Sequence, residues 1–243
     1  MAYQLKYSRY GEFAILIEWP AKIHTSILKN SLLFKKAITS FYIKKKVEVV
    51  SSYNSLLIIY PNAIDKFNSE VSNLKHLYFK GFVTEVKNTT TWEIPVCYDA
   101  DFGTDIEAFS VEKKMSKTEI IKLHSTAIYT IYFTGFLPGF LYLGGLHSRL
   151  FLDRKKTPNL KVKKGAVAIG GNQTGVYPND SPGGWHIIGN SPIDFFNVNT
   201  NPPSLFKSGD QLKFTPIDAS SYLEIKQQIL KSEYHLKSFI THD

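Results

Sequence analysis

Residues 129–216 are a series of short apolar stretches that glycine, proline and asparagine separate. The densest interruption is GGNQTGVYPNDSPGGW at 170–185, which contains five glycines and two prolines. A helix cannot accommodate so many breakers. The flanking stretches, GAVAIGG and WHIIGN, have the length and the β-branched residues of strands. Many short strands at this spacing predict a closed or nearly closed β-barrel. The further strands that we expect are IYTIYF, IDFFNV and DQLKFTP.

Residues 1–80 have a different pattern, in which two strands followed by a helix occur twice. YQLKYSRYGEFAILIEW predicts two strands around Tyr10-Gly11, and VEVVSSYNSLLIIYP predicts a hairpin with its turn near Tyr53-Asn54. Apolar residues after each pair recur at the spacing of one helix face. They are Ile23, Ile27, Phe34 and Ile38 in the first helix, and Ile64, Phe67, Val71, Leu74 and Tyr78 in the second. The repeated order predicts a small antiparallel sheet with two helices on one face, ferredoxin-like in outline.

The texture of the chain changes at KGFVTEVKNTTTWEIPV, which is polar, rich in threonine and without helical periodicity. We therefore expect an α+β domain over residues 1–85 and a mainly-β domain over residues 86–243. Within the second domain, Ser116 lies three residues before Glu119, which is the capping-box spacing that begins a helix. A terminal helix is expected over PIDASSYLEIKQQILKSEYHLKSFI, with Asp218 as its cap.

The composition predicts a soluble, cytoplasmic protein with a full hydrophobic core. The 243 residues are 43% hydrophobic, the start MAYQLKYSRYGEFAILIEW resembles no signal peptide, and no apolar run is long enough to span a bilayer. Cys97 is the single cysteine, which excludes an internal disulfide, and we interpret it as a small buried hydrophobe. The net charge of +8 comes from dispersed lysines, so we expect a solvated surface and no nucleic-acid or membrane partner.

Familiar catalytic and metal-binding motifs are missing from the sequence. There is no G-x-x-x-x-G-K-[ST] phosphate loop, no G-x-G-x-x-G between a strand and a helix, and no G-x-S-x-G serine elbow. The seven histidines include no H-x-H or H-E-x-x-H pair, so we expect no bound metal. Hydrolysis by one of these devices alone is therefore not expected.

Two loop-like clusters carry the side chains that could form a binding site. The first is FTGFLPGFLYLGGL at 133–146, which combines four glycines and a proline with many aromatic and aliphatic residues. One interpretation is a tight, buried crossover between strands, where glycine permits close backbone approach. The other is an apolar pocket wall in which Phe136, Phe140 and Tyr142 offer flat faces to a small ligand. The residue types alone leave both interpretations open.

The second cluster is the glycine-rich stretch at 170–185 itself. Gln173, Thr174 and Tyr177 can all form hydrogen bonds, and loops held on a rigid scaffold commonly bind ligands. We therefore predict that these three residues contact a ligand or a partner. Asp180 is a candidate base or anchor, but an aspartate in a turn commonly bonds to the backbone, and we favour that role.

Three further residues have both a functional and a structural interpretation. His124 shares a helix face with Ile120 and Ile121, so it is either a core histidine, which we favour, or a general base. Arg149 and Arg154 bracket LFLD, and a planar guanidinium suits the recognition of a carboxylate or phosphate. Arginines are also common on protein surfaces, so this signal is modest.

Three segments are similar to the carboxyltransferase-domain subunit 1 family, whose members are called the B subunit of 5-oxoprolinase, allophanate hydrolase subunit 1 or the sporulation kinase inhibitor KipI. The segments are GFLPGFLYLGGL, GGNQTGVYPNDSPGGWHIIGNSP and PPSLFKSGDQLKF. The likeness extends from IPVCYDADFGTDIE at 94 to about 217 and, more loosely, through YGEFAILIEW and SYNSLLIIYP. The resemblance implies a small α+β domain followed by a cyclophilin-like β-barrel, to which we add the C-terminal helix.

The resemblance also implies a role in a multi-subunit enzyme. The B subunit would work with subunit 2, also called the C subunit, and with the A subunit in an ATP-dependent 5-oxoprolinase, which opens a cyclic amide to glutamate. We expect the complex to consume ATP and this chain to be inactive alone, and we leave open whether ATP contacts it. The alternatives are a regulatory protein that inhibits a sensor histidine kinase, and subunit 1 of an allophanate- or urea-processing amide hydrolase. The candidate residues are His124 and Asp180 for proton transfer or orientation, and Phe136, Phe140, Arg149, Arg154, Gln173, Thr174 and Tyr177 for substrate binding.

The sequence departs from the family pattern in two places. Leu141 replaces the second proline of the usual PGFPYL. RLFLDRKKTPNL has Asn159 after its proline, where the family tends to carry a Pro-Arg step. If the second arginine contacts an anionic substrate in relatives, Lys155 or Lys156 would have to replace it here, and a lysine lacks the fork geometry of a guanidinium.

Overall fold

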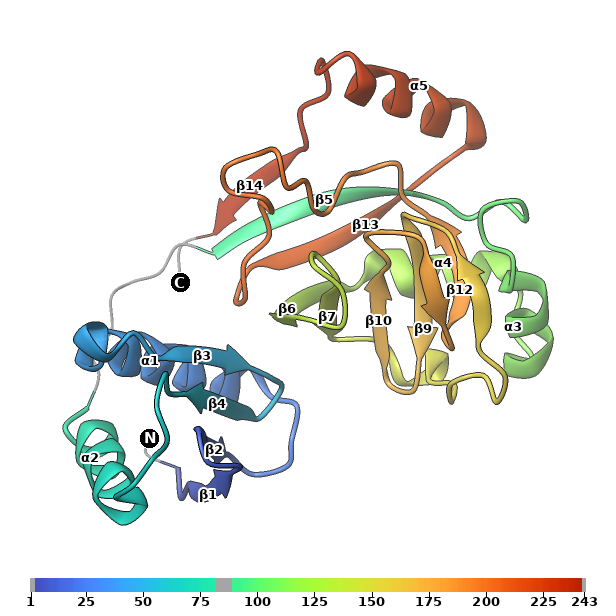
Figure 1. The fold of residues 1–243 in the computed structure, drawn as a ribbon. Coiled ribbons are helices and arrows are strands. Elements are labelled where there is room, and N and C mark those ends of the chain that lie inside the picture. The colour runs from blue at the N-terminus through green and yellow to red at the C-terminus, as the bar shows by residue number, and fades with distance from the viewer. Residues whose placement is uncertain (1–2, 82–88, 242–243) are drawn as a thin grey trace. The chain divides into compact units, whose positions relative to one another are not determined.

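The computed structural model describes residues 3–81 and 89–241 and divides the chain into two compact units, residues 1–87 and 88–243 (Figure 1). Each unit has its own sheet and its own hydrophobic core. The predicted boundary between residues 85 and 86 lies outside the described residues. Within the described residues, no helix combines the length and the apolar character that a membrane span requires.

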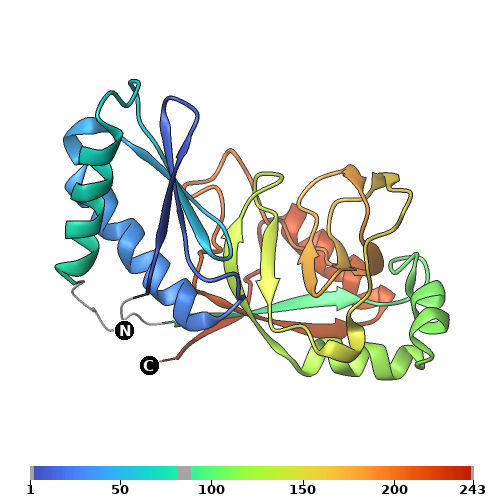
Figure 2. The same cartoon turned by 90° about the horizontal axis from the view of Figure 1, so that it is seen from below.

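The first unit is a four-stranded antiparallel sheet with two helices on one face (Figure 2). Its elements are β1 (Lys6–Tyr10), β2 (Ala14–Glu18), α1 (Thr25–Phe41), the 3-10 helix η1 (Ile43–Lys45), β3 (Glu48–Ser51), β4 (Ser55–Ile59) and α2 (Phe67–Phe79). The sheet order is β1-β2-β4-β3, and both predicted strand pairs and both helices are confirmed. Ile64, which we assigned to the second helix, is buried but precedes α2. The chain order β-β-α-β-β-α is the ferredoxin-like order with its last strand moved to the front. The ferredoxin-like assignment itself stays a prediction.

The predicted apolar face of α1 forms the core of this unit. Ile27, Phe34 and Ile38 are buried, whereas Ile23 precedes the helix and is 39% exposed, so its assignment to the helix face was wrong. The helix begins after His24, because the imidazole of this residue accepts a hydrogen bond from the backbone amide of Ser26.

The second unit is built on a closed β-barrel of seven strands. Its elements are β5 (Thr89–Cys97), α3 (Ile106–Lys113), α4 (Lys117–Thr126), β6 (Ile128–Thr134), β7 (Leu141–Gly144), the 3-10 helix η2 (Ser148–Leu150), β8 (Asn159–Val162), β9 (Ala166–Gly170), β10 (Gln173–Val176), β11 (Ser181–Gly183), β12 (His186–Asn190), β13 (Gln211–Ile217), α5 (Ala219–Leu230) and β14 (Ser238–Thr241). The barrel order is β12-β9-β10-β7-β6-β13-β5, and pairing of Asn190 with Cys97 joins β12 back to β5. The predicted barrel is therefore confirmed. Strand β14 adds to the other side of β5, and the small sheet of β8 and β11 is separate.

Two predictions for the second unit are wrong, one in the type of an element and one in the length of a helix. IDFFNV forms no strand, although Ile193 and Phe195 are buried in the barrel core, so the apolar pattern reflected burial and not pairing. The terminal helix ends at Leu230 because Ser232 takes a left-handed backbone (φ 60°), and the chain then forms β14. Both predicted helix starts are confirmed, with the Asp218 carboxylate accepting from the Ser221 amide at 2.8 Å.

Side chains of the barrel wall alternate between two apolar clusters. Along β9, Val167 and Ile169 join the interior core, whereas Ala166 and Ala168 join a smaller cluster on the outer face. The outer cluster consists of Phe140, Val162, Ala166, Ala168, Tyr177, Trp185 and Ile187. Cys97 is fully buried, as its interpretation as a small hydrophobe predicted. The glycine-rich stretch at 170–185 contains β10 and β11, so it is a structured part of the barrel wall.

Gly170→Ala tests whether this outer face needs its glycines. A Cβ at Gly170 would lie 2.5 Å from Cδ1 of Trp185, so the indole or the strand must shift. We expect a loss of about 1–3 kcal/mol in the free energy of unfolding, measured by urea titration. Gly184→Ala is the control, because its added Cβ would meet only the Lys155 carbonyl oxygen, at 3.8 Å. Equal stability of the two variants would contradict the packing described here.

Candidate functional site

Five aromatic side chains gather on the outer face of the barrel, and we call them the aromatic cluster: Phe136, Phe140, Tyr142, Tyr177 and Trp185. Phe140 is buried at its centre, with ring centroids 4.9 Å from Tyr142, 5.3 Å from Tyr177 and 5.5 Å from Trp185. The last two pairs are edge-to-face, which is a favourable arrangement of aromatic quadrupoles. The cluster therefore forms one rigid apolar wall.

The small residues of β9 and β10 make room for this wall. Added Cβ atoms at Gly170 and Gly175 would lie 2.5 Å and 3.2 Å from atoms of the Trp185 ring. The indole therefore packs directly against the backbone of the two strands. We predicted no role for Trp185 from the sequence, although the residue follows Gly183 and Gly184 at the start of a predicted strand.

The turn between β6 and β7 presents one ring of the cluster to solvent. Pro138 and Gly139 occupy the central positions of a turn that the Phe140 amide closes on the Leu137 carbonyl, and Gly139 has the positive φ (87°) that a type II turn requires. Phe136 also has a positive φ (66°), which is uncommon outside glycine, and it is 62% exposed. Residues 134–139 line an open hollow of about 290 Å³. Of the two interpretations of this segment, Phe140 fits the buried crossover and Phe136 fits the pocket wall.

Arg154 brings a positive charge to the aromatic cluster. Its guanidinium carbon lies 5.7 Å from the ring centre of Trp185, a cation–π contact, and the side chain is exposed. Burial raises the pKa of the Tyr142 and Tyr177 hydroxyls, and the nearby charge of Arg154 offsets only part of this rise. Both phenols are therefore protonated at neutral pH. They can donate hydrogen bonds, but they cannot act as bases.

Gln173 begins β10 beside this cluster. It pairs with Gly170 across the antiparallel ladder, and directly opposed residues project to the same face, so its side chain lies on the Trp185 side of the wall. Its Oε1 atom is buried and has no hydrogen-bond partner among the residues that the structure describes. An unsatisfied buried acceptor costs about 1–3 kcal/mol, so turning this amide toward a ligand would be favourable.

Thr174, the next residue of β10, points into the barrel. Its hydroxyl donates to the Ala168 carbonyl (3.0 Å), so it accepts from Nε2–H of His124 (2.9 Å). Nδ1 of His124 then accepts from the Tyr98 hydroxyl (2.8 Å). Burial lowers the pKa of His124 to about 3, so the imidazole is neutral with both nitrogens bonded. His124 is thus the core histidine that we favoured. Because the side chains of His124 and Thr174 are both fully buried, the general-base role of His124 and the ligand contact by Thr174 were wrong.

The two remaining candidates lie apart from the cluster contacts. Asp180 is exposed, and its carboxylate accepts from the Lys164 amide (2.7 Å), which fixes one turn to another in the structural role that we favoured. Arg149 forms an ion pair with Glu119 (2.7 Å), and this pair links η2 to α4. The structure therefore brings together Phe136, Phe140, Arg154, Gln173 and Tyr177, and it separates Asp180 and Arg149 from them. Among the described residues, no three histidine, cysteine, aspartate or glutamate side chains gather as metal ligands would.

His124→Gln tests the neutral core histidine. Between pH 6.5, the ordinary pKa of histidine, and about pH 3, the His124 imidazole is protonated in the unfolded chain and neutral in the folded chain. Stability must therefore fall as the pH falls, by about 2 kcal/mol between pH 7.5 and pH 5.0 from this residue. The variant is expected to lose correspondingly less over the same interval, measured by urea titration at both pH values. The other histidines are common to both proteins, so identical losses would contradict the assignment.

Comparisons with known proteins agree with one another. Residues 5–206 match the family model described as carboxyltransferase domain, subdomain C and D. The chain is 31% identical to the B subunit of 5-oxoprolinase from Bacillus subtilis (strain 168), over 94% of this chain and 99% of that protein. It is 39% identical to the B subunit of 5-oxoprolinase from Haemophilus influenzae, over 69% of this chain and 78% of that protein.

Two solved structures also resemble this chain. A conserved uncharacterized protein of Pyrococcus horikoshii is 38% identical with a TM-score of 0.53, over 89% of this chain and 100% of that one. The K. lactis urea amidolyase superposes with a TM-score of 0.81 at 14% identity, over 99% of this chain and 16% of that one. The second likeness concerns the fold alone.

Proposed function

Because this chain belongs to the carboxyltransferase-domain family of subdomains C and D, we propose that it is the B subunit of an ATP-dependent 5-oxoprolinase-type complex. The observation that carries the proposal is the near full-length correspondence to a relative named as the B subunit of 5-oxoprolinase. The other components are the C subunit, which is the subunit 2 protein, and the A subunit, and the complex works in the cytoplasm. For the two units of this chain we retain the names ferredoxin-like and cyclophilin-like.

The reaction opens the lactam ring of 5-oxoproline to glutamate. Water adds to the lactam carbonyl, the carbon–nitrogen bond breaks, and the nitrogen leaves with a proton as the amine of glutamate. The five-membered amide is unstrained and stabilised by resonance, so hydrolysis of ATP to ADP and phosphate provides the driving force. The substrate thus combines a carboxylate, a lactam and a small apolar ring, and a site for it needs a partner for each.

The aromatic cluster and its neighbours offer these partners. The Arg154 guanidinium suits the carboxylate, because its planar fork can bond both oxygens. Gln173 suits the lactam, because an amide side chain both donates and accepts. Phe136 is the exposed ring of the cluster, and it can cover the apolar carbons of the substrate.

The work of this chain is binding and orientation, and the chemistry at the lactam belongs to a shared site. Tyr142 remains protonated and is partly exposed, so it orients the substrate as a donor and takes no proton from water. Tyr177 also remains protonated, but it is buried and supports the cluster from within. Arg154 is the cation that contacts the cluster, and a triphosphate is bound more effectively by several cations or by a row of backbone amides. We therefore assign ATP to one of the partner proteins and expect this chain to be inactive alone.

Reconstitution tests the proposed function directly. The full chain is purified with the A and C subunits from the same organism, and glutamate release from 5-oxoproline is measured with and without ATP. We expect release only when all three subunits and ATP are present. If the folded chain adds nothing to the rate of its partners, the proposed function is wrong.

Arg154→Ala tests the substrate-binding role in that complex. Loss of a charge-assisted, bidentate contact is expected to lower kcat/KM at least about tenfold, mainly by raising the KM for 5-oxoproline. Lys122→Ala is the matched control, because it also removes one positive charge, from an exposed position in α4. The control is expected to keep its kcat/KM within about twofold of the wild type. A similar effect of the two substitutions would remove Arg154 from the site.

A further inference from the structure

We propose that Asp105 is a positioning residue that holds Arg154 against Trp185; its effect on turnover rests on the proposed function. Asp105 precedes α3 in the sequence, 49 positions before Arg154, and lies in the segment IPVCYDADFGTDIE, where the sequence analysis gave it no role of its own. Its carboxylate reaches the residue that follows Arg154 along the chain, Lys155.

Each neighbour of Arg154 along the chain is hydrogen-bonded to one neighbour of Trp185, and we call residues 153–155 the Arg154 strap. The Asp153 carbonyl accepts from Nε2 of His186 (2.8 Å), and the Lys155 amide donates to the Gly184 carbonyl (2.7 Å). Arg154 is thereby set beside Trp185 by its backbone as well as by its guanidinium.

The Asp105 carboxylate bonds the Arg154 strap to β12. One carboxylate oxygen pairs with the Lys155 ammonium (2.6 Å), and the other accepts from the Ile187 amide of β12 (2.7 Å). The Asp105 amide also donates to the Ile187 carbonyl (2.8 Å). A single residue therefore joins the strap to the strand that follows Trp185.

The use of the carboxylate indicates a role beyond helix capping. An aspartate at an N-cap normally accepts from the free amides of its own helix. Asp105 occupies that position of α3 but makes no such bond, because both oxygens face Lys155 and Ile187. The pair is also half-buried, with side chains 23% and 18% exposed, so solvent screens it less than the exposed Lys117–Glu107 pair of the same region.

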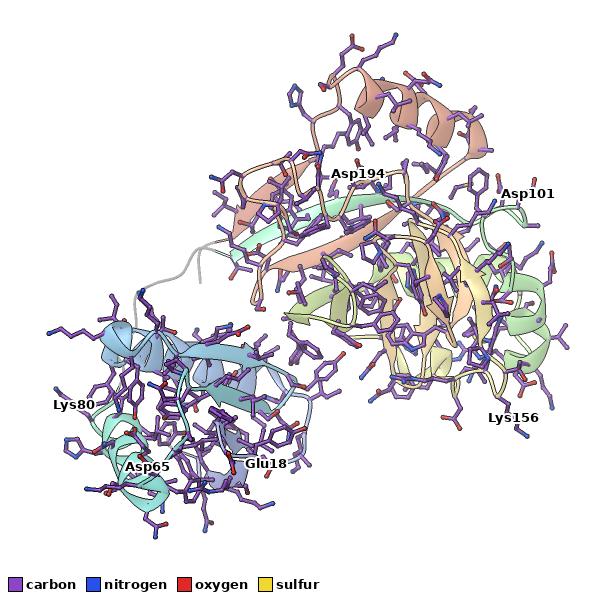
Figure 3. The ribbon with its side chains drawn as sticks, viewed as in Figure 1. Glu18, Asp65, Lys80, Asp101, Lys156 and Asp194 are labelled. Carbon is purple, nitrogen blue, oxygen red and sulfur yellow. The ribbon has the colours of Figure 1, made fainter. Side chains whose placement is uncertain are left out.

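The Asp105–Lys155 ion pair also determines which cation is available to bind the substrate carboxylate. The Lys155 ammonium is neutralised by Asp105, so it cannot replace an arginine as the anion partner. Lys156, the other lysine considered for that purpose, is exposed at the edge of the second unit (Figure 3). The ion pair of Lys155 thus leaves Arg154 to meet the substrate carboxylate.

The first measurement reports the position of Arg154 by NMR and does not depend on turnover. The chain has three arginines, Arg9, Arg149 and Arg154, so the Nε–Hε region of a proton–nitrogen NMR spectrum is simple to assign. In the full-length wild type, the ring current of Trp185 should displace the Arg154 signals. We expect Asp105→Asn to return them toward the values of a free arginine. In the reconstituted complex, the same variant should raise the KM for 5-oxoproline about tenfold and change kcat less than about threefold.

Glu107→Gln is the matched control, because it removes an equal charge two positions further along the chain, in the first turn of α3, and breaks only the exposed pair with Lys117. It should leave the Arg154 signals unchanged. Lys155→Met is the second variant, because it removes the ion pair between the strap and Asp105 while Asp105 keeps its bond to Ile187. It provides the test if Asp105→Asn does not fold. Unchanged Arg154 signals in a folded Asp105→Asn or Lys155→Met protein would overturn the positioning role. Displaced signals with an unchanged KM would confirm the positioning and reject Arg154 as the substrate contact.

Discussion

The contact between the Trp185 ring and the backbone of β9 and β10 supports the aromatic cluster on the outer face of the barrel. It exists because Gly170 and Gly175 lack side chains there, and it fixes the indole as a flat surface. Phe140 packs edge-to-face on that surface, and Arg154 lies against it. A cation and a group of rigid rings thus come together on a barrel wall that would otherwise be only a structural surface.

Strand β10 connects this face with the interior of the barrel. Gln173 lies on the outer face, and Thr174 is bonded to the buried imidazole of His124. Side chains of a strand alternate between faces, so a register shift of one residue would bury Gln173 and expel Thr174. The hydrogen bonds from Tyr98 through His124 to Thr174 disfavour that shift, because each partner would be left unsatisfied in the core. His124 therefore has a structural role, and its neutral, buried imidazole takes no part in proton transfer.

Local patterns were sufficient to predict most of the fold. Strand length, turn residues and capping at Ser116 and Asp218 all depend on neighbouring residues, and they gave the barrel and two of its helices. Contacts between distant segments were not visible in the same way. Asp105 and Lys155 are 50 positions apart, and the bond between them depends on how the barrel closes. The apolar pattern of IDFFNV predicted burial correctly but a strand incorrectly. Buried loop residues and paired strand residues have the same preference for apolar side chains, so the pattern cannot separate them.

Arg154 is the residue on which the proposed substrate site mainly depends. The chain belongs to a family in which relatives are named as the B subunit of 5-oxoprolinase, and Arg154 is the exposed cation on its aromatic cluster. A crystal structure of the reconstituted complex with 5-oxoproline would test this role most directly. We expect the substrate carboxylate about 3 Å from the Arg154 guanidinium, with the ring of the substrate against the aromatic cluster. Substrate bound wholly within one of the partner proteins, away from Arg154, would contradict the proposed site.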